Sequence, residues 1–452
     1  MDTAYRSATE LAEALRAREI GSRELTELYL ARIGSSVLNA VVTVDAQGAL
    51  EQAAARDAEP VRGPLHGLPM TVKDALAVAG MRSTGGAEEL ADHVPGTDAP
   101  VVAALREAGA VIVGKTNVPR WSTDLQTSNT VFGTTRNPWD PERTPGGSSG
   151  GAAAAVAAGL TSVEVGTDLG GSIRIPSHFC GVFGLKPSYG LVPSLGYLDH
   201  VGGGATAADV NVVGPIARSA QDLDLLLGVL AGPSPRHRPA WRVSLPAPDA
   251  TRLDGLRVAF WGDLPGLPVD PEYGMVLRRV ADVLSDAGAL LTTPAPPVDV
   301  GGQIELYHRL LDAAVSPALG EGHAEAIAGG HRDWLRSQSS RAGTIDAWTR
   351  WFDGFDVLLC PVTFTTAFGH DDTGSFATRR LGERYHRELV DWPGLIGVVE
   401  LPSAVAPVGT VASGMPAGVQ VVAPFLQDRR AVAVAGLVAE ACGGGYRVPP
   451  HS

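Results

Sequence analysis

The chain has 452 residues, of which 44% are hydrophobic and 19% charged; this excludes a disordered segment and allows one or two domains with a large core. Its formal net charge of −13 offers no cationic field, so we expect neither nucleic acid nor a membrane as a partner. The cysteines Cys180, Cys360 and Cys442 are widely spaced, which argues against a zinc ribbon or disulfide framework and favours a reducing compartment, the cytoplasm.

Targeting segments are not evident. The first 19 residues mix acids and arginines at helical spacing and lack the basic-then-apolar run of a secretory signal. Residues 150–165 form the longest low-charge stretch, but they are mostly alanine and glycine and are interrupted by Glu164. A bilayer span needs a longer apolar run. We therefore expect neither a signal peptide nor a transmembrane helix.

In chain order, the pattern predicts helices first and then alternating strands and helices. Ser7 and Glu10 are spaced as a capping box, and two or three amphipathic helices are expected in the first 60 residues. We expect strands at 68–72, 110–113, 162–168, 255–261, 356–360, 403–408 and 417–422, and helices at 99–108, 151–158, 220–230, 273–287 and 429–439. This order predicts an α/β fold with a central mixed β-sheet covered by helices on both faces.

Lysine is rare in this chain. Of the 36 basic residues only three are lysine, namely Lys73, Lys115 and Lys186. Arginine can replace lysine wherever a solvated positive charge suffices, but it cannot lose its proton, whereas a buried lysine can. The surviving lysines are therefore candidates for positions that need a neutral amine.

Residues 109–116, GAVIVGKT, match the GxxxxGK[ST] pattern of a phosphate-binding loop. The residues between the two glycines are all apolar strand formers, and Pro119 follows where a helix should begin. A phosphate cradle needs a flexible loop of exposed amides instead. We interpret this segment as a buried strand.

The serine-rich run 146–150, GGSSG, matches the GxSxG pattern of a Ser-His-Asp hydrolase. The residues before it, RNPWDPERTP, do not make the strand that this motif requires, and the 11 histidines carry no local signature. We do not favour a histidine-based triad.

A third interpretation combines two glycine-serine turns with a lysine. Ser148 and Ser172 are each enclosed by glycines, and Lys73 ends a predicted strand. Glycine lets backbone N–H groups converge on one point, as an oxyanion hole requires. Serine is a weak nucleophile that needs a base, and a desolvated lysine can be neutral near pH 7 and serve as one. These turns could supply a nucleophile and amide donors without histidine.

The run TPGGSSGGAAAAVAAGL, followed by GTDLGGSIRIP and FCGVFGLKP, resembles the signature of the amidase signature family. The resemblance extends upstream to LHGLPMTVKD and downstream to GMPAGVQVVAP, and it is weakest over residues 232–350. It implies the amidase-signature fold as a single domain over 1–452, with a helical lead-in over 1–60 and a divergent, substrate-shaping region over about 232–395.

The resemblance also implies a Ser-cisSer-Lys triad. Ser172 would be the nucleophile, Ser148 would relay the proton after a cis peptide bond from Gly147, and Lys73 would be the base. The residues whose backbone N–H groups would hold the oxyanion are Leu169, Gly170, Gly171 and Ser172.

Neighbouring polar residues are expected to have structural roles. We expect Ser149 to hydrogen-bond within its loop, and Asp168 and Arg174 to fix the Ser172 turn through a charge-assisted bond. Cys180 is expected to be a small buried residue. Lys115 and Lys186 are expected to make structural hydrogen bonds, and so are the loop asparagines Asn129 and Asn137.

These features favour an amidohydrolase that cleaves a carboxamide through a Ser172 acyl-enzyme, with no metal or cofactor. One alternative is a protein resembling the A subunit of the tRNA-dependent amidotransferase, which releases ammonia from glutamine into a partner. Another is an acyltransferase or amide synthase, in which an amine intercepts the same acyl-enzyme. A non-catalytic binding protein is disfavoured because all three triad positions are filled.

The partner we expect is a small-molecule amide. The loop at 197–205 and the segment 300–395 are expected to shape its acyl pocket, and the aromatic runs WTRWF and DWPGL could line it, although such aromatics are more often core. The identity of the amide, the stereoselectivity and the oligomeric state do not follow from the residues; a homodimer is suggested by the family alone.

Overall fold

The computed structural model describes residues 2–319 and 329–452; residues 320–328 of the divergent region lie outside the described residues. Twelve α-helices are described there: α1 Ala8–Arg16, α2 Ser22–Ser35, α3 Ala46–Ala58, α4 Pro100–Glu107, α5 Gly150–Ala157, α6 Arg174–Cys180, α7 Ala220–Leu230, α8 Pro271–Asp286, α9 Val300–Val315, α11 His331–Trp351, α12 Asp391–Gly397 and α13 Asp428–Ala441. None of the helices in this part of the chain is long and apolar enough to cross a membrane.

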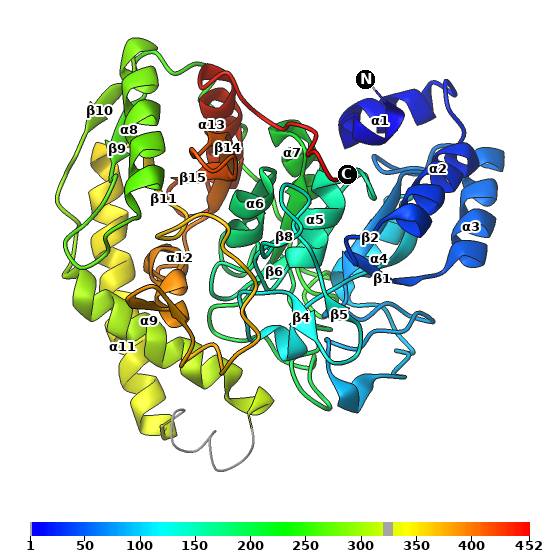
Figure 1. Cartoon of the computed structure of the whole chain (residues 1–452), viewed down its shortest axis with the longest axis horizontal. Coiled ribbons are helices and arrows are strands. Elements are labelled where there is room, and N and C mark those ends of the chain that lie inside the picture. The colour runs from blue at the N-terminus through cyan, green and yellow to red at the C-terminus, as the bar shows by residue number, and fades with distance from the viewer. Residues whose placement is uncertain (1, 320–328) are drawn as a thin grey trace.

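The strands form one large sheet, a small three-stranded sheet and two short hairpins (Figure 1). They are β1 Val41–Val44, β2 Pro69–Lys73, β3 Val111–Thr116, β4 Ser128–Asn129, β5 Gly133–Thr134, β6 Glu164–Asp168, β7 Phe183–Lys186, β8 Val212–Ala217, β9 Arg257–Phe260, β10 Leu290–Thr292, β11 Val357–Pro361, β12 Arg380–Leu381, β13 Arg384–Tyr385, β14 Ser403–Thr410 and β15 Pro416–Val422.

The large sheet has eight strands in the order β10-β9-β11-β15-β14-β7-β8-β6. It is mixed: β9 pairs in parallel with both β10 and β11, and the remaining neighbours are antiparallel. Helices α7, α8 and α13 pack on one face, and α5 and α6 pack on the other. The predicted mixed sheet with helices on both faces is confirmed.

The small sheet has the order β1-β3-β2, and α2 and α3 cover it. Strand β2 at its edge packs against β6 at the edge of the large sheet, and α5 contacts both sheets. Helix α5 is built of glycine, alanine and valine, and a Cβ at Gly151 would lie 2.4 Å from the backbone nitrogen of Asn117. The small residues therefore allow α5 to pack against the end of β3.

Local sequence accounts for most of these elements. The capping box at Ser7 and Glu10 is present at the start of α1. Ser219 caps α7, which buries Leu223, Leu226 and Leu230 at helical spacing. The P-loop-like segment is a buried strand, β3, as predicted.

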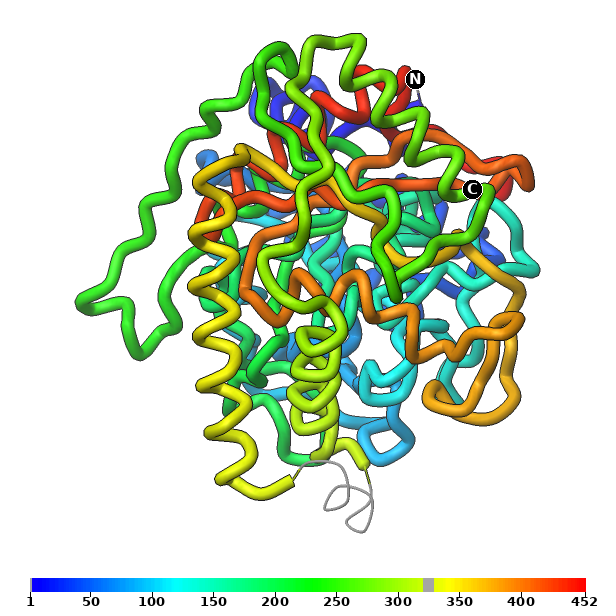
Figure 2. Tube along the Cα trace, turned by 90° about the vertical axis from the view of Figure 1, so that its left-hand side faces the viewer, coloured from blue at the N-terminus to red at the C-terminus, as the bar shows by residue number. Residues whose placement is uncertain are grey.

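Two expectations need correction. The first 60 residues are not only helical, because β1 pairs with β3 there. The sequence VVTV, rich in β-branched residues, accounts for this strand. The divergent region also contains two long helices that were not predicted, α9 and α11. Helix α11 runs along one side of the molecule, and the segment 232–250 stands out from the body without a helix or strand (Figure 2).

Candidate active site

Lys73 is the last residue of β2 and is fully buried where β2 meets β6. Its Nζ lies 2.7 Å from the Ser148 Oγ and 2.7 Å from the Thr167 Oγ1. Burial lowers the pKa of Lys73 from its usual 10.5 to about 7, against the opposing effect of the Asp168 and Glu164 carboxylates. A neutral amine is therefore available at this position near neutral pH.

Ser148 lies in the loop that leads into α5, and the Gly147–Ser148 peptide is cis, as the resemblance implied. Its side chain is buried beside Lys73. The loop is held by Thr127, whose Oγ1 donates to the Gly146 carbonyl (2.9 Å) and accepts from the Gly150 N–H (3.1 Å). These bonds fix the serine relative to the end of β2.

Ser172 follows β6 in the tight turn 169–172. Its hydroxyl makes no hydrogen bond with any described residue, and 5% of the residue is exposed. The backbone N–H of Ser149 donates to the Ser172 carbonyl at 3.1 Å, which joins the two serine-containing segments. The hydroxyl is thus free to bond to a substrate.

Asp168 and Arg174 hold this turn as predicted. The Arg174 guanidinium donates to both carboxylate oxygens of Asp168, at 2.8 and 3.0 Å, and both side chains are fully buried. Burial alone would raise the pKa of Asp168, but Arg174 lowers it to about 2. The pair is therefore charged throughout the neutral range.

The turn 169–172, which was expected to hold the oxyanion, differs from that expectation at Gly171. Its N–H already donates to Asp168 Oδ1 at 2.9 Å, so it is engaged in holding the turn. Within the described residues the N–H groups of Leu169, Gly170 and Ser172 have no protein acceptor. Gly171 is still required here, because its φ is +95° and a Cβ would lie 2.7 Å from Pro393 Cγ.

We expect Asp168→Ala to lower the free energy of unfolding by about 3–5 kcal/mol, because Arg174 is left as a buried charge without its partner. Urea unfolding of the purified variant measures this. The matched control is Glu27→Ala, which breaks the exposed Arg23–Glu27 pair and should cost about 0.5 kcal/mol or less. Equal losses in the two variants would contradict a structural role for the buried pair.

Other predicted residues lie as expected, with one difference at Ser149. Cys180 is buried, which raises the pKa of its thiol, and Lys115 and Lys186 make buried hydrogen bonds to the Leu76 and Pro187 carbonyls. Ser149 Oγ donates outside its loop, to the Thr167 carbonyl at 3.3 Å. The WTRWF run belongs to the core, because Trp348 packs edge-on against Trp261.

Three residues of the divergent region pack against the turn 169–172. The Tyr307 hydroxyl of α9 donates to the Leu169 carbonyl at 3.3 Å. Val390 lies beside Gly170, and Pro393 of the DWPGL run lies beside Gly171. On the other side, Leu76 pairs with Tyr197, which brings the 197–205 loop next to the end of β2.

Sequence reasoning missed the threonines around Lys73. Thr167 accepts a hydrogen bond from Lys73, and Thr71 and Thr116 bond to Glu164 beneath it. In β2, Thr71 and Lys73 alternate with apolar residues and mark one polar face, whereas in β6 Thr167 and Glu164 lie on opposite faces. This alternation alone does not show which residues of the two strands meet.

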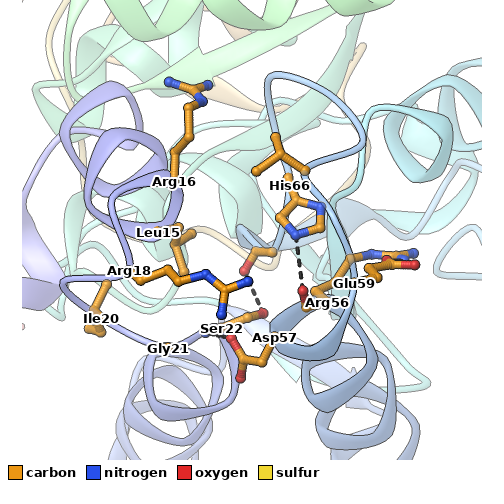
Figure 3. A pocket seen from close by; sticks show the side chains of 12 residues that line it. Leu15, Arg16, Arg18, Ile20, Gly21, Ser22, Arg56, Asp57, Glu59 and His66 are labelled. Carbon is orange, nitrogen blue, oxygen red and sulfur yellow. Dashed lines mark hydrogen bonds and ion pairs between the residues drawn. The ribbon is translucent and has the colours of Figure 1, made fainter.

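A surface pocket of about 200 Å³ between α1, α2 and α3 contains none of the predicted site residues (Figure 3). Its two acidic residues are engaged locally: Asp57 accepts from the Ser22 and Arg23 N–H groups at the start of α2, and Glu59 pairs with Arg56. Across residues 2–319 and 329–452, no group of three or more His, Cys, Asp or Glu side chains is placed to hold a metal ion.

The fold and the site together define an α/β enzyme in which a buried lysine is hydrogen-bonded to a serine hydroxyl. The chain belongs to the amidase signature family: the family model described as Amidase matches residues 24–319 and 305–432. It is an amide-cleaving enzyme.

The similar proteins include both hydrolases and one component of an amidotransferase. The chain is 34% identical to the A subunit of the glutamyl-tRNA(Gln) amidotransferase of Thermosynechococcus vestitus, over 93% of this chain and 94% of that protein. It is 33% identical to indoleacetamide hydrolase of Bradyrhizobium diazoefficiens, over 92% of this chain and 82% of that protein.

Solved structures show the same fold. A 6-aminohexanoate cyclic dimer hydrolase with substrate superposes with a TM-score of 0.84 at 26% identity, covering 99% of both chains. A bacterial aryl acylamidase superposes with a TM-score of 0.83 at 27% identity, covering 97% of this chain and 96% of that one.

Proposed function

We propose that this chain hydrolyses a small-molecule carboxamide to a carboxylic acid and ammonia or an amine, with Lys73, Ser148 and Ser172 as its catalytic triad. The observation that carries the proposal is the 2.7 Å contact between the Lys73 Nζ and the Ser148 Oγ in a buried site. At this distance a neutral amine can accept the serine proton.

The proposed reaction runs through an acyl-enzyme. Lys73 takes a proton from Ser148 while Ser148 takes one from Ser172, and the Ser172 Oγ bonds to the carbonyl carbon. The N–H groups of Leu169, Gly170 and Ser172 stabilise the oxyanion, and Gly171 acts by holding the turn. The C–N bond then breaks as the proton returns from Lys73 through Ser148 to the leaving nitrogen. Water hydrolyses the ester by the same relay.

Release of ammonia from glutamine into a partner is the second candidate, favoured by the similarity to the A subunits of amidotransferases. To separate the two, the purified chain is given aliphatic and aromatic amides or glutamine, and ammonia and acid are measured. We expect turnover of simple amides by the chain alone. Turnover of glutamine only, or of no amide, would contradict a stand-alone amidase.

The same assay tests acyl transfer. With hydroxylamine added as an amine acceptor, a hydrolase forms mostly acid, whereas an acyltransferase or amide synthase forms mostly hydroxamate. We propose the hydrolytic outcome, because Ser172, although buried, keeps 5% of its surface open to solvent, so water can reach the acyl-enzyme.

We also propose that the chain is a single domain that works in a reducing compartment, the cytoplasm. One hydrophobic cluster extends from Ala4 to Ala439, and all three cysteines are free thiols. The homodimer suggested by the family stays a prediction that light scattering can test.

A further inference from the structure

The free N–H groups of the turn 169–172 belong to peptide groups whose carbonyls point the other way. The peptides of this turn are trans, and in a trans peptide the N–H and the C=O point in opposite directions. The Ser172 N–H shares its peptide with the Gly171 carbonyl, which accepts from the Ile175 N–H at 2.7 Å. The backbone at the start of α6 therefore fixes the direction of the Ser172 N–H.

The Gly170 N–H has no such backbone support. It shares its peptide with the Leu169 carbonyl, and among the described residues the one donor to that carbonyl is the Tyr307 hydroxyl at 3.3 Å. A Cβ at Gly170 would lie 3.0 Å from the same hydroxyl oxygen, closer than ordinary van der Waals contact. The direction of this N–H therefore depends on a side chain from the divergent region.

Tyr307 is itself held firmly in α9. It is fully buried, and burial raises the pKa of its phenol, so the hydroxyl keeps the proton that it donates. Its ring packs against the backbone of Gly394 in α12, where a Cβ would clash with the ring. One turn earlier, Gln303 donates to the Leu395 carbonyl at 2.6 Å and accepts from the Trp348 Nε1 at 3.0 Å. These bonds join α9 to both α12 and α11.

We propose that Tyr307 is a positioning residue that acts through the Leu169–Gly170 peptide: its hydroxyl holds the carbonyl and thereby directs the Gly170 N–H toward the oxyanion. The inference rests on the proposed function, in which this N–H stabilises the oxyanion. A hydrogen bond to the carbonyl also polarises the peptide and makes its N–H a stronger donor. The divergent region thus supports the chemistry as well as the acyl pocket that it is expected to shape.

The test is the variant Tyr307→Phe, which keeps the ring against Gly394 and removes the hydroxyl. An oxyanion donor acts in the transition state, so kcat for a simple amide should fall about tenfold while KM stays within about twofold of the wild type. The loss should be smaller than the roughly 10²–10³-fold cost of removing a direct oxyanion donor. An unchanged kcat, or a loss that appears only in KM, overturns the proposal.

The matched control is Tyr29→Phe. Tyr29 is also buried, and its hydroxyl donates to a backbone carbonyl at the same distance, 3.3 Å, but the acceptor is Ala4 in the N-terminal segment. We expect the two variants to shift the urea midpoint of unfolding by similar amounts and only Tyr307→Phe to lose kcat. Equal losses of kcat in both variants would trace the effect to stability and overturn the proposal.

A second variant, Gly394→Ala, displaces the ring instead of removing the hydroxyl, and it does not depend on the folding of Tyr307→Phe. It should lower kcat in the wild-type background and have little further effect in Tyr307→Phe, because the bond is already absent there. A wild-type kcat in Gly394→Ala overturns the proposal. So do equal losses in the two backgrounds, since these would mean that α12 acts on the turn through packing alone.

Ser172→Ala, measured with the same amide, separates this inference from the proposed function. A Ser172→Ala variant as active as the wild type overturns the proposed function. An inactive Ser172→Ala together with a wild-type kcat in Tyr307→Phe overturns only the role of Tyr307.

Discussion

Replacement of Ser172 by alanine is expected to lower kcat/KM for amide hydrolysis by about 10⁴-fold or more, because the covalent route is lost and only substrate binding and oxyanion stabilisation remain. The folded structure should persist, since the Ser172 hydroxyl makes no hydrogen bond with any described residue. Ammonia release from a simple amide measures the rate, and circular dichroism checks the fold.

Ser149→Ala is the matched control for that experiment. Ser149 is also a buried serine of the same site, but its hydroxyl donates to the Thr167 carbonyl at 3.3 Å and takes no part in the proposed relay. Its loss should reduce the rate by less than about tenfold, because it removes only two long hydrogen bonds to the Thr167 backbone, at 3.3 and 3.4 Å. A Ser172→Ala variant as active as Ser149→Ala would show that the nucleophile is a different residue.

Lys73→Met is expected to lower kcat/KM by about 10³-fold, the scale of a lost general base. Lys73→Arg should be equally inactive, although it keeps the positive charge, because a guanidinium cannot lose its proton. An active Lys73→Arg would mean that the residue supplies charge and not proton transfer.

The pH dependence of the wild type follows from the same group. The base must be neutral, and burial lowers the pKa of Lys73 to about 7, so kcat/KM should rise with pH through about 7 and then level off. The folded pKa is below the usual 10.5, so the unfolded chain binds more protons between these values and stability should increase with pH there. Lys73→Met should lose this contribution.

Helices with a strong local pattern were predictable, and helices defined by tertiary packing were not. The helix expected over 220–230 is α7, with leucines at helical spacing and a serine cap. Helix α11 was missed because most of its 21 residues are polar and its buried residues are only Ser337, Arg341 and Trp348. Its position depends on contacts such as the bond from Arg341 to the Val398 carbonyl, which no local pattern indicates.

The residues of the candidate site also fall into a predictable group and a group that only the fold reveals. Lys73, Ser148 and Ser172 stand in ordered motifs whose glycines and strand ends indicate their chemistry, so the sequence singled them out. Thr167 and Glu164 belong to the site only because the edge of the small sheet packs against the edge of the large one. Contacts between two sheet edges depend on the fold of the whole chain and leave no signature in local spacing.

All three lysines of the chain are buried: Lys73 and Lys115 are 0% exposed and Lys186 is 2% exposed. The exterior therefore presents guanidinium groups but no lysine ammonium. Acylating reagents that target primary amines, such as activated esters, find no lysine on the folded surface, and glutaraldehyde cannot cross-link copies through lysine. Lysine modification of this protein therefore reports unfolding, and immobilisation can use carboxylates or the partly exposed thiol of Cys442 instead of lysine.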